Sequence, residues 1–553
     1  MRQSELFIPT LRQTPKDITT DAHQLLIQSG FIRQVAAGVY AYLPLAFLVL
    51  EKIKKIIREN FSKEQAGEVD FPYLMPADIL EKSGQLDTLS PELFMINDRA
   101  QRQFVLSPSA EALFASVVFG EGLSYKRFPL TLFHVQTKFR DDQKVRHGLF
   151  QAREFLVAAA YSFQATSESL QTVFNHFEGS FNHIFQSCGI TALSVLSENS
   201  ILKGGLAKQF VALTDIGSVE IARSSVGDYL VNRQLATNYF SEKITHVKEE
   251  ELQVVTTSEL PKELTPIVAW PYQIDDQKVL ILLPAHRTLN ESKLKNFFLG
   301  QTVSKIPAEN LPCPQAFLGP IDQTDFVIYA DRTIAQQTNG IYGANQEDRY
   351  YLHGNAPRDF MMQAVADFLL VEDGDTAPDG VGQIEILRGI DIADLLKLDD
   401  FYAQTLNGFY TDENAEKQPI LMNCFEIGIS KMLQVIAQQH HDEKGLLWPK
   451  AVAPFDVHIL LVNLAEKVQG ELLTFVEEQL TGSDYSYLVD DRPEHIGVKF
   501  ADSELIGCPI RIVIGKKASE GILEITLRQS GEKVEVKKED LMEILPILSA
   551  SQF

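Results

Sequence analysis

The stretch Phe133–Phe163 gathers residue types that can bind a phosphate-bearing ligand. Its first part alternates polar and apolar side chains with the period of two that is typical of a β-strand. The alternation places four polar residues on one face of that strand: His134, Gln136, Lys138 and Arg140. A guanidinium held on a strand binds a phosphate or a carboxylate through two parallel hydrogen bonds, which an ammonium cannot do. The spacing fits a ligand-binding hairpin and a solvent-facing charged hairpin equally well.

A loop and a second strand complete this hairpin. The loop carries Asp142, Arg146 and His147, and a basic loop of this kind can close on a polyphosphate. The second strand opens near Phe155, whose ring can stack on a base. It then reads Val-Ala-Ala-Ala over residues 157–160, a run without a polar side-chain atom. The hairpin therefore combines a charged first strand and loop with a second strand that contains an entirely apolar run.

The preceding sequence predicts the elements that hold the hairpin. Residues 1–60 place apolar side chains at three- and four-residue spacing, which predicts helices with a glycine break near "SGF". The stretch "QRQFVLSPSAEALFASVVF" predicts a strand, a turn and a helix with Ser107 or Ser109 as its N-cap. After the hairpin, the sequence from Tyr161 to Ile190 predicts a long amphipathic helix.

The rest of the chain predicts three further blocks. Residues 225–375 alternate strand and helix patterns and form a self-contained α/β block. Strand character resumes at "QIEILRGIDIADLL", and "LMNCFEIGISKMLQVIAQQ" predicts a strand that runs into a helix. The last hundred residues alternate buried strands and helices, which predicts a small parallel or mixed sheet covered by helices.

Composition limits the class of protein. A chain of 553 residues predicts several domains, and a formal net charge of −24 argues against coating nucleic acid by bulk charge. Local basic patches, such as residues 52–60, stay possible but are more simply solvated surface. The four cysteines lack zinc spacing and indicate reduced thiols. With no apolar run that could span a bilayer and no secretory signal at the N-terminus, we expect a cytoplasmic protein.

Several stretches together resemble the bacterial-type prolyl-tRNA synthetases, which are class II aminoacyl-tRNA synthetases. "TKFRD", "REF" and "AYSF" resemble motif 2 of that family, "EVDFPYLMPADILEKSGQ" resembles motif 1, and "CFEIGISK" stands at motif 3. "DRTIAQQTNGIYGAN" is similar to the inserted editing domain, and "DDRPEHIGVKFADSELIGCP" to the anticodon-binding domain. The resemblance implies an α/β (α+β) fold: an antiparallel-sheet catalytic core, an inserted α/β domain of editing type and a C-terminal α/β anticodon-binding domain.

The resemblance also implies domain boundaries and partners. Residues 1–224 and 376–450 correspond to the two parts of the catalytic domain, residues 225–375 to the inserted domain and residues 451–553 to the anticodon-binding domain. The family reaction joins ATP and proline to prolyl-adenylate and passes the prolyl group to its tRNA. The implied partners are ATP, Mg²⁺, a tRNA of the proline type, proline or another small amino acid, and a second copy of the chain in a homodimer.

Residue roles carry over position by position from the resemblance. Arg140 would grip the α-phosphate and the substrate carboxylate, Asp142 would replace the usual motif 2 glutamate, and Phe155 would pack on adenine. Asp391 stands where the family holds Mg²⁺ with a glutamate, and Lys431 stands at the catalytic arginine of motif 3. The ATP-binding set is Arg140, Asp142, Arg146, His147, Phe155, Asp391 and Lys431. The amino-acid pocket would consist of Ser109, Glu111 and Arg140.

The sequence departs from the family pattern where the chemistry should occur. Ala158 and Ala159 replace a Lys-Asp pair, and Glu426 replaces a glycine at motif 3. A carboxylate at position 426 would repel phosphate and crowd a backbone approach that glycine permits. Further departures are Lys208 and Gln209 in a Ser-His-Glu-Phe segment, Asp394 for a histidine, and no editing-type lysine between Lys262 and Lys278.

Three hypotheses follow from these departures. The first is a working proline–tRNA ligase with a divergent site. The second is a paralogue that has lost or altered aminoacylation, so that it accepts another amino acid or binds tRNA or protein as a regulator. The third is a structural partner subunit that uses the motif 1 dimer surface.

Overall fold

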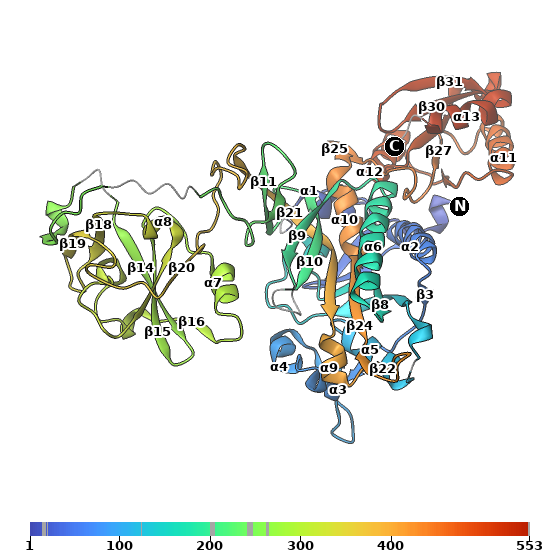
Figure 1. The fold of residues 1–553 in the computed structure, drawn as a ribbon. Helices are drawn as coiled ribbons and strands as arrows, with labels where there is room; N and C mark the ends of the chain where they lie inside the picture. Colours follow the sequence, from blue (N-terminus) through green and yellow to red (C-terminus); the bar gives the residue numbers. More distant parts are fainter. Residues whose placement is uncertain are drawn as a thin grey trace. The chain divides into compact units, whose positions relative to one another are not determined.

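Figure 1 shows the fold in a computed structural model that describes residues 1–13, 18, 20–122, 124–199, 205–240, 247–261 and 265–550, with only the backbone of Thr88. The chain forms two compact units. Unit 1 consists of Met1–Ser194, Gln209–Ile216 and Ile390–Phe553, and unit 2 of Val195–Lys208 and Gly217–Gly389. Among the described residues, no helix is both long enough and apolar enough to cross a membrane.

An antiparallel sheet forms the centre of unit 1. Strand β21 (Ile384–Asp399), which enters unit 1 at Ile390, pairs with β24 (Leu421–Gly428), which pairs with β8 (Glu154–Gln164). Strand β8 pairs with β7 (Leu130–Phe139) along the whole predicted hairpin. The long helix α6 (Ser167–Ser187) packs on β8 and β24, as Figure 1 shows. The predicted antiparallel core is confirmed, and so is the predicted amphipathic helix from Ser167 onward, whereas residues 161–164 belong to β8.

Shorter elements complete this part of unit 1. They are β3 (Gly67–Glu68), β4 (Leu74–Pro76), α3 (Ala77–Lys82), α4 (Leu86–Leu89), β5 (Met95–Asn97), β6 (Gln103–Leu106), α5 (Glu111–Gly120), β10 (Leu206–Leu213, in unit 1 from Gln209), α9 (Phe401–Leu406), β22 (Phe409–Thr411), β23 (Lys417–Pro419), α10 (Ile429–Gln439), β25 (His441–Asp442) and β26 (Gly445–Leu446). Among them, β3 pairs with β7 and β10 pairs with β21 in the same sheet, and the others lie outside it. The predicted N-cap of α5 is wrong. Ala110 occupies that position, and the Ser107 hydroxyl instead donates to the Ser109 carbonyl at 2.6 Å.

The N-terminal segment is only partly helical. Helices α1 (Asp21–Gln28) and α2 (Pro44–Lys63) flank a hairpin of β1 (Ile32–Ala36) and β2 (Val39–Tyr42). The helical prediction is therefore wrong between residues 32 and 42. Gly38 turns the hairpin with φ at +74°, a conformation that glycine adopts without strain.

The C-terminal part of unit 1 follows the predicted alternation of strands and helices. Its elements are β27 (Val457–Leu461), α11 (Lys467–Thr481), β28 (Tyr487–Asp490), α12 (Ile496–Ile506), β29 (Ile510–Ile514), β30 (Ile522–Leu527), β31 (Lys533–Lys537) and α13 (Leu541–Ala550). The strand order is β28-β27-β29-β30-β31, parallel across the first three strands and antiparallel beyond them. The sheet is mixed, and a cluster of buried aliphatic side chains joins it to α11 and α13.

Unit 2 has its own sheet and core. Its elements are β9 (Ala192–Glu198, in unit 2 from Val195), β11 (Val219–Ser224), β12 (Leu230–Asn232), β13 (Gln253–Thr256), β14 (Ile267–Ile274), β15 (Gln277–Pro284), α7 (Glu291–Phe297), β16 (Val303–Lys305), β17 (Val327–Asp331), α8 (Arg332–Ala335), β18 (Gly340–Gly343), β19 (Arg349–Gly354) and β20 (Ala364–Ala366). The strands from β13 to β20 build one mixed sheet in the order β13-β19-β18-β14-β15-β17-β20, with β16 beside β14. Lys262, which bounds the expected lysine-free stretch, lies outside the described residues.

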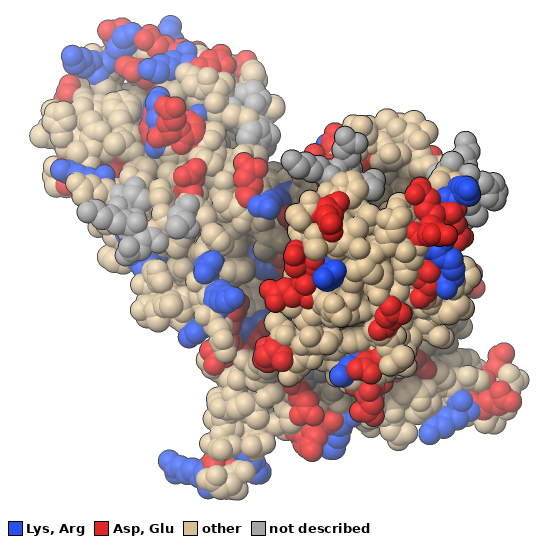
Figure 2. Space-filling model, turned by 90° about the vertical axis from the view of Figure 1, so that its left-hand side faces the viewer, with Lys and Arg blue, Asp and Glu red and all other residues tan. Residues whose placement is uncertain are grey.

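The surface in Figure 2 carries interspersed acidic and basic side chains among a majority of uncharged residues. On the described residues of that face, neither sign of charge forms a continuous field.

Candidate active site

One row of residues crosses four strands of the unit 1 sheet. Ala159 of β8 pairs with His134 of β7 on one side and with Glu426 of β24 on the other. Glu426 in turn pairs with Asp394 of β21. Directly paired residues point to the same face of a sheet. The row therefore defines one face, and the polar side chains of the predicted hairpin lie on it.

This face is mostly buried. His134, Gln136 and Lys138 are at most 1% exposed, whereas Arg140 at the strand end is exposed. The solvent-facing interpretation of the hairpin is therefore wrong for all but its tip. A fully buried lysine needs carboxylates near it, because an isolated buried ammonium is costly.

Lys138 lies among such carboxylates. Burial lowers the pKa of Lys138 to about 8, and the carboxylates of Glu426 and Glu111 partly oppose that decrease. Its Nζ donates to the Ser107 hydroxyl over 3.4 Å, a long hydrogen bond. The ammonium is therefore held in place chiefly by charge.

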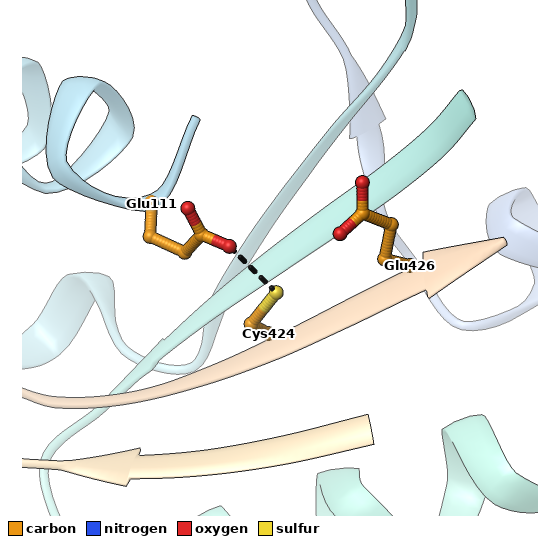
Figure 3. A group of neighbouring side chains, drawn as sticks. All are labelled: Glu111, Cys424 and Glu426. Carbon is orange, nitrogen blue, oxygen red and sulfur yellow. Dashed lines mark hydrogen bonds between the residues drawn. The ribbon is translucent and has the colours of Figure 1, made fainter. Parts of the chain in front are cut away.

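A compact acidic group faces this lysine. The ligating atoms of Glu111, Cys424 and Glu426 all lie within 4.8 Å of one another. Figure 3 shows the Glu111 carboxylate reaching from the start of α5 toward β24, where the other two side chains stand on one face. The Cys424 thiol donates to Glu111 Oε1 at 3.5 Å, and Oε2 of Glu111 has no hydrogen-bond partner.

Charge repulsion marks the same group. Burial and then the nearby Glu111 carboxylate raise the pKa of Glu426 to about 7, although Arg140 and Lys138 oppose the rise. Burial and the Asp391 carboxylate likewise raise the pKa of Asp394. The site therefore holds more negative charge than its own cations neutralise.

Arg140 and Phe155 meet at the open end of the face. The Arg140 guanidinium stands 5.6 Å from the centroid of the Phe155 ring, within the range of a cation–π contact. The Arg140 backbone N–H donates to the Arg153 carbonyl at 2.9 Å, which extends the hairpin pairing by one residue. The strand pair thus brings together the arginine and the ring that the sequence predicted.

Asp391 and Lys431 form a second pair on the same side of unit 1. Lys431 Nζ donates to Asp391 Oδ2 at 2.6 Å and to the Asp391 carbonyl at 3.0 Å. Both side chains are half-buried. On the same strand as Asp391, Asp394 accepts a hydrogen bond through Oδ1 from Gln209 Nε2 at 3.0 Å. These contacts place two of the departures from the family pattern, Gln209 and Asp394, against each other.

The predicted loop residues do not join this cluster. The Asp142 carboxylate accepts the backbone N–H of Lys144 at 2.9 Å and so closes the loop itself. Arg146 is exposed. His147 adopts a left-handed conformation with φ at +59°, and its carbonyl accepts from Gln434 at 2.8 Å. The structure brings these three residues to the hairpin loop but not to the buried face.

Ser109 and Glu111 contribute differently to the predicted pocket. Glu111 points into the acidic group and is 3% exposed. Ser109 is half-buried and meets the face through its carbonyl, which accepts from Ser107. Lys138, Cys424 and Glu426 were not among the predicted site residues. For Lys138 the signal was present, because the alternation of two already put it on the face with Arg140.

Two departures from the family pattern prove to be direct neighbours. Ala159, where the family has an aspartate, pairs with Glu426, where the family has a glycine. A carboxylate is therefore present in this row of the sheet, on the neighbouring strand. The face as a whole presents buried acidic groups for a small cation and, at its open end, a guanidinium beside an aromatic ring for a phosphate and a base.

Comparison with known proteins identifies the families that the chain matches. Residues 94–440 match the family "tRNA synthetase class II core domain (G, H, P, S and T)", and residues 456–547 match "Anticodon binding domain". The chain is 40% identical to the proline–tRNA ligase of Listeria monocytogenes serotype 4a (strain HCC23) over 565 residues, which covers 99% of both chains. It is 39% identical to that of Bacillus velezensis (strain DSM 23117 / BGSC 10A6 / LMG 26770 / FZB42), covering 99% of this chain and 100% of the relative.

A solved structure shares the fold. The prolyl-tRNA synthetase of Cryptosporidium parvum, crystallised with L-proline and AMP, matches 98% of this chain and 78% of its own with a TM-score of 0.60. Its sequence identity to this chain is 13%, so this likeness concerns the fold alone.

Proposed function

The chain belongs to the proline–tRNA ligases, which are class II aminoacyl-tRNA synthetases, and we propose that the buried face of β7, β8, β24 and β21 is its active site. The protein activates proline with ATP and transfers the prolyl group to tRNA. The observation that carries the site assignment is the convergence of Arg140, Phe155 and Glu111 on one sheet face that their strands and helix fix in place.

The first chemical step is an in-line displacement at phosphorus. The proline carboxylate attacks the α-phosphate of ATP, the new bond forms the mixed anhydride, and pyrophosphate leaves with the electron pair of the broken bond. Arg140 suits this step, because one guanidinium can bind the carboxylate and the α-phosphate together and neutralise the charge that builds up between them. Phe155 would support the adenine, and Glu111 would accept a hydrogen bond from the amino group of proline.

Mg²⁺ is part of the proposal. The described residues form no hydrogen bond to the second carboxylate oxygen of Asp391, so that oxygen fits a hard cation shared with substrate phosphates. When bound there, the ion would neutralise phosphate charge. Lys431 orients the Asp391 carboxylate through its 2.6 Å contact and keeps a positive charge beside it.

The remaining assignments are proposals too. Asp142 shapes the hairpin loop, and Arg146 and His147 would approach the phosphates only if that loop closes on ATP. Residues 1–224 with 376–450 would form the catalytic domain, residues 225–375 the inserted domain, and residues 451–553 the module that binds the tRNA anticodon. A homodimer and a cytoplasmic location complete the proposal by analogy with the family.

Full-length similarity to proline–tRNA ligases favours the first of the three hypotheses. The departures at positions 159, 394 and 426 lie within a face that remains charged and closely packed, so a paralogue without activity is not favoured.

Proline-dependent exchange of pyrophosphate into ATP, followed by charging of a tRNA of the proline type, tests the function. We expect exchange with proline and none with alanine at equal concentration. Absence of exchange with every amino acid would contradict the function. Exchange restricted to another amino acid would instead support the second hypothesis.

A further inference from the structure

Glu426 is the feature of this chain that the proposed mechanism leaves unused. It stands in the strand row between Ala159 and Asp394, half-buried and aimed at the same space as Glu111. Within the described part of the chain, its carboxylate forms no hydrogen bond, and Oε2 of the buried Glu111 lacks a partner as well. Two carboxylates with open acceptor positions thus face each other.

An independent unpartnered group lies in the same space. The Tyr161 hydroxyl is fully buried without a hydrogen-bond partner, and Tyr161 pairs with Cys424 across β8 and β24. Its pairing with Cys424 puts Tyr161 on the face of the acidic group. Burial raises its pKa most, followed by the groups of Glu111, Cys424, Glu426 and Tyr402. Two buried groups without a partner, Glu111 Oε2 and the Tyr161 hydroxyl, lie on the same face as the Glu426 carboxylate and indicate the position of a ligand.

The spacing suits a tetrahedral nitrogen. The ligating oxygens of Glu111 and Glu426 lie within 4.8 Å of each other. Two carboxylates that each accept a charge-assisted N–H hydrogen bond of about 2.8 Å from one tetrahedral nitrogen stand about 4.6 Å apart. Prolinium is a secondary ammonium with two N–H donors on one nitrogen, so it matches two facing acceptors.

The charge balance around Glu426 also favours a positively charged ligand. Six groups face Glu426 from the elements around it: Glu111, Cys424, Tyr161, Asp394, Lys138 and Arg140. With Glu426 included, three carboxylates face two cations. One further positive charge balances the cluster, and binding of that charge would return Glu426 from partial protonation to the carboxylate form.

We propose that Glu426 is a specificity-determining residue that accepts the second N–H of the substrate's secondary ammonium, opposite Glu111. This inference rests on the proposed function, because it concerns the amino-acid pocket of that site. Glu426, which stands where the family pattern has a glycine, thereby receives a binding role. Ala159 stands where the family has an aspartate, so the carboxylate of this sheet row lies on β24 here instead of on β8.

Kinetics of the wild-type protein and Glu426→Gln test the assignment. We expect the variant to raise KM for proline on the order of 10- to 100-fold, with kcat and KM for ATP changed less than about threefold. An unchanged KM for proline, or a rise in KM for ATP instead, would overturn the proposal. Loss of wild-type exchange would contradict the function itself, so the two failures are distinguishable.

The pH dependence separates binding from a structural role. Because the raised pKa of Glu426 lies at about 7, the wild-type KM for proline should rise as the pH falls through 7 and the carboxylate becomes protonated. The KM of Glu426→Gln should stay flat over that range. This wild-type profile needs no variant to fold, and a flat wild-type profile counts against the assignment.

A relocation variant provides the matched control. Glu426→Gly alone should weaken proline binding, and Ala159→Asp combined with Glu426→Gly should recover at least tenfold of the loss, because it returns a carboxylate to the paired position. No recovery in a variant of wild-type thermal stability would overturn the proposal. A zinc ion that copurifies at one equivalent with the wild type and is absent from Glu426→Gln would also overturn it, since the cluster would then be a metal site.

Discussion

Two parts of unit 1 differ in how completely their buried charged side chains are hydrogen-bonded. In the C-terminal sheet region, from β27 to α13, the fully buried Asp490 accepts two hydrogen bonds from the Arg492 guanidinium, at 2.9 and 2.6 Å, and Arg492 also donates to Asp502 at 2.8 Å. Lys499, which is 1% exposed, donates to the carbonyls of Leu461 and Asp490. The Asp490 and Asp502 carboxylates are thus paired with a guanidinium, and the buried Lys499 ammonium is held by two carbonyl oxygens.

The face of β7, β8, β24 and β21 that is proposed as the active site buries comparable groups but leaves several of them without hydrogen-bond partners. Oε2 of Glu111, both ring nitrogens of His134 and the Tyr161 hydroxyl have no partner, and Lys138 has one long hydrogen bond. The C-terminal region is not perfect, since single nitrogens of His458 and Arg511 are unpartnered. Leaving a buried polar group unpaired costs about 1–3 kcal/mol. Such groups persist where a ligand supplies the missing partner, so the comparison separates groups that bind from groups that hold the fold.

Removal of Arg140 should give the largest effect on activity. We expect Arg140→Ala to lower kcat/KM in pyrophosphate exchange by about 10²–10³-fold, because its charge acts on the developing transition state. Thermal stability should stay close to wild type, since the side chain is exposed and contacts chiefly Phe155. Arg127→Ala, an exposed arginine just before β7, is the matched control and should retain activity within twofold. Equal losses in both variants would contradict the role of Arg140.

Removal of the Asp490 side chain should lower stability but leave the exchange activity of the folded protein unchanged. Asp490→Ala leaves Arg492 without its main partner, and breaking a buried ion pair costs about 3–5 kcal/mol. We expect a clear loss of stability in denaturant unfolding followed by circular dichroism, while the folded variant keeps wild-type exchange kinetics. Glu111→Gln is the matched variant on the proposed active-site face, and it should lower pyrophosphate-exchange activity without lowering stability. If both variants were destabilised alike, the distinction between the two regions would fail.

Lys431 should have an intermediate effect that concerns ATP. Its charge-assisted hydrogen bond to Asp391 at 2.6 Å fixes the carboxylate that would hold Mg²⁺. We expect Lys431→Ala to raise KM for ATP about tenfold and to leave KM for proline within threefold. Lys431→Arg retains the charge and should stay near wild type. A rise in KM for proline alone would place Lys431 in the amino-acid pocket instead.

The C-terminal fold could be predicted from the sequence because each of its elements carries its own pattern. Strands such as β27 and β29 are short apolar runs, and the helices between them bury one stripe each. The N-terminal hairpin could not be predicted in this way. The turn at Gly38 is fixed by distant residues: its carbonyl accepts from the Arg153 backbone at 2.8 Å, and a Cβ at position 38 would lie 2.8 Å from Val145. No local pattern reports such a contact.

The candidate site likewise contains some residues that the sequence could predict and others that it could not. Arg140 and Phe155 could be predicted because one hairpin carries both residues. The acidic group could not, since Glu111 starts a helix more than three hundred residues before Cys424 and Glu426. The sequence suggested that Glu426 would repel phosphate, whereas in the structure the first charge to raise its pKa is that of Glu111. Only the register of β8 and β24 relates Ala159 to Glu426.

The smallest predicted effect concerns an ion pair between β25 of the core and the C-terminal sheet region. Both guanidinium Nη atoms of Arg528 donate to the Asp442 carboxylate at 2.7 Å, and this contact lowers the pKa of Asp442 to about 2. A depressed carboxylate pKa stabilises the folded state above the unfolded value near 3.8, and this contribution disappears as the pH falls through 2. Because the Asp442 side chain is 40% exposed, solvent screening limits its contribution to about 1 kcal/mol or less.

Thermal midpoints of wild type and Asp442→Asn between pH 2 and pH 6 measure this contribution. We expect a small deficit in the variant above pH 4 that narrows as the pH falls toward 2 and that shrinks with added salt. The pyrophosphate-exchange kinetics should not change, because Asp442 and Arg528 are hydrogen-bonded to each other and lie outside the proposed active-site face. A deficit that persists unchanged at pH 2 would mean that Asp442 acts through the backbone N–H groups of Lys444 and Gly445, which it also accepts, and not through its charge. The Arg528 ion pair would then add nothing measurable to stability, and Asp442 would stabilise only its local turn.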